Sequence, residues 1–472
     1  MVDANDIGIA PNPNASQRLH RVAVVLVACT MIGFFWRSED PLGLKTLLGE
    51  VILFLASRPA IQWAKHNRAW FPAFELLCLT TIAFYAIPLL VGHKDLSLYQ
   101  PRVVTESAML VIAFLAAANL SFNFRSRSMR PSPWAMAPLL STEGSRYVPA
   151  GMFLNTIYIY VETFTDLLPS EIIGTLRALF FGLGTVAIFV LARQIGQGVI
   201  SGRTRAFFIV NLAAQVIILF SQLYLIRGIS LLALGAIAYS AAKRRVPILW
   251  IALILPVVAV LHNGKSEMRK HYWEEMNPLP TLSELPAFFN EWIDFGLQVN
   301  RDAESSTQTS VVDRASLIQM LCMSVEGVPS QKPFLYGESY FDIPALAIPR
   351  FLWPEKPSSL MANIRLAVYF DLIDPDDPFQ YSIAFGMIAE AYLNFGLFGV
   401  TALGLFFGVL YKHLSILGTG APQFSALGIL MILLTAWSFQ AELVMATWLS
   451  SLFQACVVCI GLPLAYHKLT HG

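Results

Sequence analysis

The sequence predicts an all-α integral membrane protein with about twelve transmembrane helices and one large loop domain outside the membrane. Of its 472 residues, 56% are hydrophobic and only 13% are charged, and its mean hydropathy is +0.59. Soluble globular proteins carry roughly 25% charged residues, so this composition excludes a soluble enzyme and a disordered chain. The formal net charge of +1 argues against a nucleic-acid partner, because it creates no field that attracts a polyanion.

Twelve apolar runs define the expected helices, since a spanning helix needs about 20 predominantly apolar residues. The runs are residues 20–36, 42–57, 70–91, 103–120, 147–165, 171–192, 206–226, 228–242, 246–262, 382–411, 424–441 and 444–466. A polar arm, residues 1–19, precedes the first run, and no small-residue cleavage site follows it. The first run is therefore expected to stay in the bundle as a helix and not to be a cleaved signal peptide.

The distribution of lysine and arginine predicts the orientation of these helices. If the N-terminus is cytoplasmic and the helices alternate, the inner segments hold 17 of these residues and the short outer loops hold 5. Such an excess is typical of the cytoplasmic side. Both termini are therefore predicted to be cytoplasmic, and residues 263–381 are predicted to be extracytoplasmic.

Residues 263–381 are too long and too polar to be a simple connector. These 119 residues contain 17 of the 31 acidic and 9 of the 32 basic residues, and a loop of this size is usually functional. Apolar stretches at 288–297 and 315–325 predict two short amphipathic helices, with a linker-like stretch at 302–310 between them. The predicted organisation is an arm (1–19), helices one to nine (20–262), a cap (263–381) and helices ten to twelve (382–472).

Glu390 is the most prominent ionisable residue in the predicted helices. It lies about 12 Å from the outer start of its helix, at 1.5 Å per residue, and shares one helical face with Gly386 and Asn394. The residues Asn394-Phe-Gly396 that follow predict a bend in this helix. Charged groups at this depth usually face a partner or a wet cavity. Two interpretations are open: a functional carboxylate, or a structural one paired with Arg177 or with the backbone of a neighbouring helix.

A proline-rich segment of the cap, residues 344–357, predicts a rigid ligand clamp. Its prolines fix the local backbone and hold Arg350 and Lys356 apart, with Trp353 between them. Arginine binds phosphate with two parallel hydrogen bonds and lysine acts as a point charge, while aromatic rings can stack on sugars. The same residue types also collect at membrane interfaces, so both interpretations remain open.

Three further cations and one acidic cluster are weaker candidates. Arg269, which lies in the cap just after the ninth helix and four residues before Trp273, fits either phosphate binding or ordinary membrane anchoring, and so does Arg227 in a tight outer turn. Arg314 fits a helix cap or a surface pair. The cluster at 374–377 has three aspartates but no histidine or further acid at ligand spacing, so we expect a solvated turn and no metal site.

The cap and the tenth helix resemble the bacterial Wzy-type oligosaccharide repeat-unit polymerases, which build O-antigen and exopolysaccharide chains. The similarity is concentrated in residues 262–400. The segments that carry it are Gly264–Arg269 with Trp273, Asp313-Arg314, Gly337-Glu-Ser-Tyr340, Ile348-Pro-Arg-Phe-Leu-Trp-Pro-Glu-Lys-Pro357 and Ala389-Glu-Ala-Tyr-Leu-Asn-Phe-Gly396. The resemblance implies a GT-C-like membrane glycosyltransferase in the bacterial inner membrane, with its active face in the periplasm.

The resemblance also implies a reaction, substrates and site residues. A hydroxyl of a lipid-linked repeat unit attacks a glycan carried on undecaprenyl pyrophosphate, and undecaprenyl pyrophosphate leaves. Arginines can stabilise the leaving diphosphate, so no cofactor or metal is expected. The expected partners are both lipid-linked saccharides, the bilayer and a chain-length regulator or export machinery. The implied residues are catalytic Glu390, Arg269 and Arg350 and substrate-binding Arg227, Arg314, Glu338, Tyr340, Trp353 and Lys356.

Three other functions fit the sequence. A ligase would move undecaprenyl-linked glycan to another acceptor with the same donor chemistry. A lipid-linked oligosaccharide flippase or transporter predicts charges along a central path and a small outer loop. A non-catalytic subunit of an export complex predicts that Arg350 and Glu390 tolerate substitution.

Overall fold

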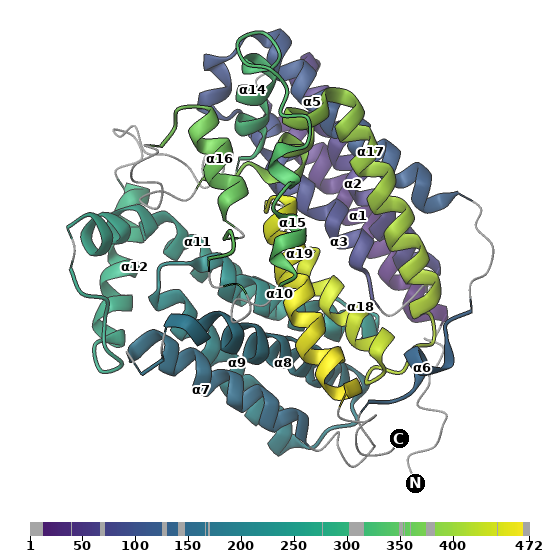
Figure 1. The fold of residues 1–472 in the computed structure, drawn as a ribbon, viewed down its shortest axis with the longest axis vertical. Helices are drawn as coiled ribbons and strands as arrows, with labels where there is room; N and C mark the ends of the chain where they lie inside the picture. Colours follow the sequence, from purple (N-terminus) through teal and green to yellow (C-terminus); the bar gives the residue numbers. More distant parts are fainter. Residues whose placement is uncertain are drawn as a thin grey trace. The chain divides into compact units, whose positions relative to one another are not determined.

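The structure, a computed structural model, is built from helices. It describes residues 13–38, 40–66, 71–124, 130–139, 147–165, 167–168, 170–275, 277–301, 316–348, 353, 355–358, 360–373, 383–440 and 442–465. Within these ranges every regular secondary-structure element is a helix (Figure 1). Nine of the described helices are long and apolar enough to cross a membrane. The expected all-α membrane architecture is confirmed at this level.

Large apolar side chains on the surface support membrane embedding. They include Trp36 in α1 (Pro13–Arg37), which is 81% exposed, and Trp250 in α11 (Ile248–Arg269), which is 57% exposed. Contiguous apolar surface of this kind is rare on soluble monomers and marks a membrane or partner interface. Lipid is the natural neighbour for such side chains on helices of spanning length.

The chain divides into two compact units, of which the first consists mainly of residues 138–311 and the second mainly of residues 4–137 and 312–457. The first unit contains α7 (Val148–Phe164), α8 (Ser170–Gln197), α9 (Gly202–Ser221), α10 (Leu225–Lys243), α11 (Ile248–Arg269), the π-helix η5 (Lys270–Glu274) and α12 (Leu285–Arg301). The division falls within the predicted cap, between Val311 and Val312.

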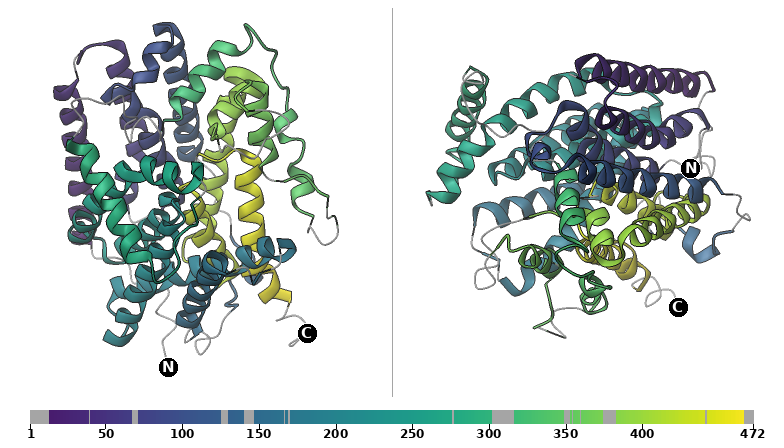
Figure 2. Two further views of the ribbon diagram at one scale, coloured as in Figure 1. Left: turned by 90° about the vertical axis from the view of Figure 1, so that its left-hand side faces the viewer. Right: turned by 90° about the horizontal axis from the view of Figure 1, so that it is seen from above.

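The second unit contains the N-terminal helices, the later part of the cap and the C-terminal helices. These are α1 (Pro13–Arg37), α2 (Leu44–His66), α3 (Ala73–Thr81), the π-helix η2 (Ile82–Ala86), α4 (Ile87–Val91), the 3-10 helix η3 (Lys94–Leu98), α5 (Pro101–Asn123), α6 (Pro133–Met136), α14 (Ile318–Gly327), the 3-10 helix η6 (Glu338–Tyr340), α15 (Ile343–Leu346), α16 (Met361–Tyr369), α17 (Gly386–Gly418), α18 (Ala426–Trp437) and α19 (Met445–Cys456). The two N-terminal helices, purple in Figure 2, lie side by side and pack on α5 through α2.

Each of the twelve predicted runs coincides with a helix, but three of these helices do not qualify as candidate spans. α7 has 17 residues and α18 has 12, while α2 has 23 residues but includes four charged ones. A helix of 12 residues rises only about 18 Å, which is less than the hydrocarbon core of a bilayer. Twelve crossings and the inside–outside orientation therefore stay predictions.

Close crossing of α5 and α17 forms the frame of the second unit. Gly404 and Gly408 bring the two backbones together: a Cβ atom at Gly404 would lie 2.4 Å from the carbonyl oxygen of Phe114, and one at Gly408 would lie 2.3 Å from that of Ala118. Small residues four apart allow such contacts between membrane helices. This crossing fixes α17, which carries Glu390.

Both helices predicted in the cap are present, although they belong to different units. In the first unit, α12 covers the predicted 288–297 helix and packs against α11, where Trp292 is fully buried. In the second unit, α14 packs against α5 and α17, and Ile318 and Leu321 are fully buried. α11 continues past its predicted end at 262 because Gly264 and Met268 are buried at the contact with α12.

We predict that Gly408→Ala destabilises the protein. The added methyl group cannot avoid the α5 backbone, and overpacking typically costs about 1–3 kcal/mol. The melting temperature in detergent should fall. The control is Gly33→Ala in α1, where a Cβ atom meets nothing within 4 Å; equal melting temperatures for the two variants would contradict the close crossing.

Candidate functional site

The predicted arginines Arg227 and Arg269 meet around one aromatic ring in the first unit. Their guanidinium carbons lie 5.1 and 5.4 Å from the ring centre of Tyr224. Arg269 also lies over Trp273, at 4.2 Å from its ring centre. Cations over aromatic faces at these distances are attracted by the ring quadrupole. Two cations predicted separately, 42 positions apart in the chain, thus belong to one cationic–aromatic group.

Hydrogen bonds fix the orientation of this cationic–aromatic group. Arg269 Nη2 donates to the carbonyl of Leu223 at 2.9 Å, and Arg227 Nη1 donates to Gln222 Oε1 at 3.2 Å. Leu223 has a φ of 60° and lies in the turn between α9 and α10, where it directs its carbonyl toward Arg269. The planar guanidinium group of arginine is the side chain that best matches phosphate geometry, and here two such groups are held beside one ring.

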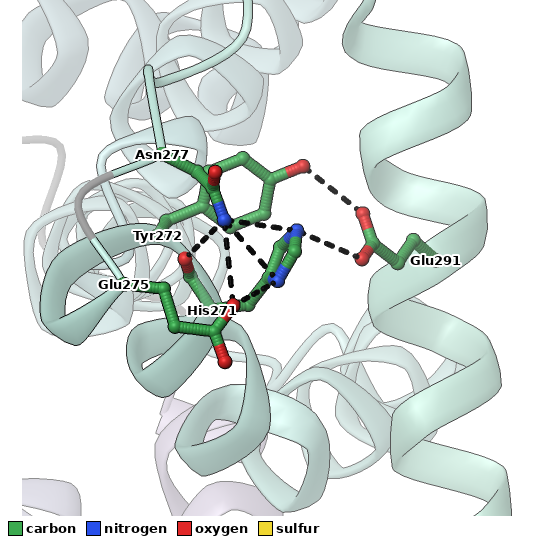
Figure 3. A network of polar contacts seen from close by, with 5 residues as sticks. All are labelled: His271, Tyr272, Glu275, Asn277 and Glu291. Carbon is green, nitrogen blue, oxygen red and sulfur yellow. Dashed lines mark hydrogen bonds and ion pairs between the residues drawn. The ribbon is translucent and has the colours of Figure 1, made fainter.

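A polar network ties η5, which follows Arg269 and includes Trp273, to α12 (Figure 3). His271 Nδ1 lies 2.9 Å from Glu275 Oε2, and its Nε2 lies 3.9 Å from Glu291 Oε1. Tyr272 donates to Glu291 Oε2 at 3.0 Å, and Asn277 donates to the carbonyl of His271 at 2.8 Å. Glu291 of α12 therefore holds the segment between Arg269 and Asn277, and this restrains the position of Trp273.

In the second unit, Glu390 is a fully buried carboxylate at the centre of a clasp between three chain segments. Its Oε1 accepts a hydrogen bond from Ser339 at 2.9 Å, and its Oε2 accepts one from the backbone amide of Met445 at 2.7 Å. The cap loop and the start of α19 are therefore both bonded to one carboxyl group of α17. The predicted alternative of a backbone partner is found, whereas Arg177 bonds to Glu162 instead.

Asn394 extends this clasp, which we call the Glu390 clasp, one helical turn along α17. Its Nδ2 donates to Ser339 Oγ at 2.8 Å, and its Oδ1 accepts from the amide of Gly337 at 2.8 Å. The helix is broken directly afterwards, at Phe395 and Gly396, where Gly396 has a φ of 59°. The break frees the carbonyls of residues 393 and 394, which accept from the amides of residues 335 and 336. The predicted bend is confirmed, and the cap loop fills the gap it creates.

Tyr340 and Trp353 line one open, mostly apolar pocket of about 590 Å³ in the second unit, together with Phe341. Phe341 is 83% exposed and Trp353 is 42% exposed. Burial, with a smaller contribution from the Glu390 carboxylate, raises the pKa of Tyr340 well above its usual value. Its phenol is therefore a hydrogen-bond donor at neutral pH and not a base.

The remaining predicted residues separate into three groups. Lys356 donates from Nζ to the carbonyls of Leu346 and Ile348, so it braces the proline-rich loop. Glu338 is exposed. Arg314, Arg350 and the 374–377 cluster lie outside the described residues. Among the residues that are described, no group of three His, Cys, Asp or Glu side chains is arranged to hold a metal ion.

Comparison with known proteins identifies a family but no characterised relative. Residues 152–433 match the model of a family described as a domain of unknown function, DUF8712. The chain belongs to this family. No curated protein and no solved structure matches the chain. The matched region includes both the cationic–aromatic group and Glu390, whereas Met445 lies beyond it.

Sequence reasoning missed the residues that hold the candidates in place. Tyr224, Ser339 and Glu291 were not predicted as partners, since each lies far in sequence from the residue it contacts. Tyr224 had one available signal, because it is an aromatic residue three positions before Arg227 in the same outer turn. Ser339 lies in the Gly337-Glu-Ser-Tyr340 segment, but nothing in that segment marks it as a partner of Glu390, and Glu291 carries no comparable signal.

We predict that Glu390→Ala destabilises the protein by several kcal/mol. The substitution leaves the Met445 amide and the Ser339 hydroxyl without their acceptor, and each such buried group costs about 1–3 kcal/mol. Thermal unfolding in detergent measures the loss. The matched control is Glu106→Ala, which removes an exposed carboxylate paired with Arg102; if both variants melt alike, the clasp contributes no stability.

Proposed function

We propose that this chain is a periplasmic-face polysaccharide polymerase of the bacterial inner membrane. It would transfer a glycan from undecaprenyl pyrophosphate to a lipid-linked repeat unit. A new glycosidic C–O bond forms at the anomeric carbon of the donor, the bond to the diphosphate breaks, and undecaprenyl pyrophosphate carries away the electron pair. The energy comes from the diphosphate ester, so the reaction requires no nucleotide.

The observation that supports this proposal best is the gathering of Arg227, Arg269 and Trp273 around Tyr224. Two guanidinium groups beside flat aromatic faces suit a diphosphate that is attached to a sugar. Cations that are fixed before the reaction stabilise the developing charge without reorganisation, which is the largest single contribution in many enzymes. In this proposal Arg227 and Arg269 bind the leaving diphosphate.

The second unit supplies features that suit a saccharide. The pocket around Tyr340, Phe341 and Trp353 presents aromatic side chains that suit a sugar ring. The Glu390 clasp holds the loop that carries Tyr340, so its contacts support a positioning role for Glu390. Its role as a general base, and the phosphate-binding roles of Arg314, Arg350 and Lys356, stay predictions.

We expect Arg227→Ala and Arg269→Ala each to reduce polymerisation by about a hundredfold or more, the usual effect of removing one charge-stabilising donor. Arg350→Ala is expected to behave alike. The measurement is the ladder of products formed by purified protein from undecaprenyl-pyrophosphate-linked repeat units. Protein yield and melting temperature should stay near the wild-type values.

The matched control is Arg205→Ala. Arg205 is exposed and lies near the start of α9, whereas Arg227 follows the end of α9, in the first turn of α10. A full ladder from both Arg227→Ala and Arg269→Ala would remove the proposed diphosphate site. A single transfer without a ladder would favour a ligase, and movement of intact lipid-linked saccharide across vesicles would favour a flippase.

Polymerisation is expected to survive EDTA, because arginines and not a divalent cation would neutralise the diphosphate. The assay is the same product ladder, measured with EDTA and again after addition of magnesium. Activity that EDTA abolishes and magnesium restores would reverse this expectation and would make Asp374, Asp376 and Asp377 the first residues to test.

A further inference from the structure

In the first unit, α12 folds back along α11 and packs against it over much of its length (Figure 1). Near the connection between the two helices, the rings of Tyr272 and Phe288 have centres 5.1 Å apart. Two turns further along α12, a Cβ atom at Gly296 would lie 2.1 Å from the carbonyl oxygen of Val260. As α12 advances from residue 288 to residue 296, its contacts therefore move back along α11 from residue 272 to residue 260.

The part of α11 that α12 reaches lies within the stretch that crosses the membrane. α11 begins at Ile248, directly after the basic residues 243–245, and basic residues next to an apolar run mark the point where a span begins. From there, a hydrocarbon core of about 30 Å takes about 20 residues. Val260 lies about 18 Å along α11 from Ile248, so the contact with Gly296 lies inside this stretch.

The inner face of α12 is buried among the ends of three candidate spans. Phe288 and Trp292 belong to one buried cluster with Phe220 at the end of α9, Leu225 at the start of α10 and Met268 near the end of α11. α9, α10 and α11 each belong to a helix long and apolar enough to cross a membrane. α12 is therefore packed into the membrane-spanning bundle of this unit and does not stand above it.

The apolar side of α12 is wider than its contact with the rest of the unit. Ile293 and Leu297 directly follow the buried residues Trp292 and Gly296, yet they are 37% and 45% exposed. Because they are four positions apart, they lie on one side of the helix. An apolar side that protein covers only in part, on a helix that also has a polar side, is typical of a helix at a membrane interface.

The polar side of α12 is equally well defined. Asn290, Asp294 and Gln298 are also spaced four apart, and all three are exposed. The exposed surface of α12 is thus divided lengthwise into an apolar strip and a polar strip. Two chemically different surroundings suit these two strips better than water alone does.

The exposed apolar strip of α12 continues a surface that already faces lipid. On α11, Trp250, Leu253, Leu255 and Val257 are each more than half exposed. Val257 lies about one turn before Val260, where α12 makes its contact. Contiguous apolar surface of this kind marks a membrane or protein partner, and its continuity with the lipid-facing part of a span favours lipid.

We propose that α12 is a re-entrant amphipathic helix, with Ile293 and Leu297 in contact with lipid acyl chains and the side that carries Asp294 facing water. This inference does not use the proposed function. It replaces the expectation that residues 263–381 lie wholly outside the membrane. Because α11 leaves the hydrocarbon core and α12 re-enters it, Arg269 and Trp273 between them lie at the level of the lipid headgroups.

The test uses single spin labels in a variant whose five cysteines are replaced by alanine, reconstituted in phosphatidylcholine liposomes. Labels are attached at Ile293→Cys, Leu297→Cys and Asp294→Cys, with Leu255→Cys as the lipid reference. Oxygen partitions into lipid, whereas a charge-neutral nickel complex stays in water. We expect the ratio of oxygen to nickel accessibility at positions 293 and 297 to approach that at 255 and to exceed that at the matched position 294 several-fold.

Three results would overturn the proposal. A ratio at 293 and 297 as low as that at 294 would place the strip in water. Low accessibility to both reagents would mean that another part of the chain covers it. Spin–spin broadening at 293 that disappears on dilution with unlabelled protein would mean that a second copy of the chain covers it.

Photolabelling of the wild-type protein keeps the proposal testable if the cysteine-free variant does not fold. A lipid-soluble phenyldiazirine forms a carbene within the bilayer, and mass spectrometry locates its adducts. We expect adducts at Ile293 and Leu297 as well as at Leu255, and none at Ser283, an exposed residue before α12. Adducts on α11 without any on α12 would overturn the assignment.

Discussion

The second unit depends on one buried carboxyl group, that of Glu390. Through its two oxygens it joins the cap loop at Ser339 to the start of α19 at Met445, and Asn394 adds a second attachment to the loop. A buried polar group costs free energy unless it is hydrogen-bonded, so the loop, α17 and the start of α19 stabilise one another. The same constraint sets the path of the chain into the pocket that Tyr340 and Trp353 line.

In the first unit, the buried polar groups that join neighbouring helices are neutral side chains, and they too are hydrogen-bonded. Gln215 of α9 bonds to Thr156 and to the carbonyl of Met152 in α7, and Gln222 bonds to Thr163 farther along the same pair of helices. Gln222 then accepts from Arg227. This series of bonds fixes the end of α9, and with it the turn that carries Tyr224, the ring that both arginines approach.

Each unit gathers helix ends that the charge distribution assigns to one side of the membrane. In the first unit these are the end of α9, the start of α10 and the end of α11, which meet around Tyr224. In the second unit they are the starts of α17 and α19, which meet at Glu390. Polar and charged groups in membrane proteins concentrate where water and headgroups are available, and the side of the membrane stays a prediction from the charge distribution.

The sequence by itself determined the helical class, the position of the apolar helices and the bend after Asn394, because hydrophobic runs and glycine act on the local backbone. It also singled out Arg227, Arg269 and Glu390, since charges near apolar runs are rare. Only the tertiary structure decided which of these residues share a site and what holds them. Tyr224, Ser339 and Met445 act through contacts across distant segments, and one chain contains no local signal for such contacts.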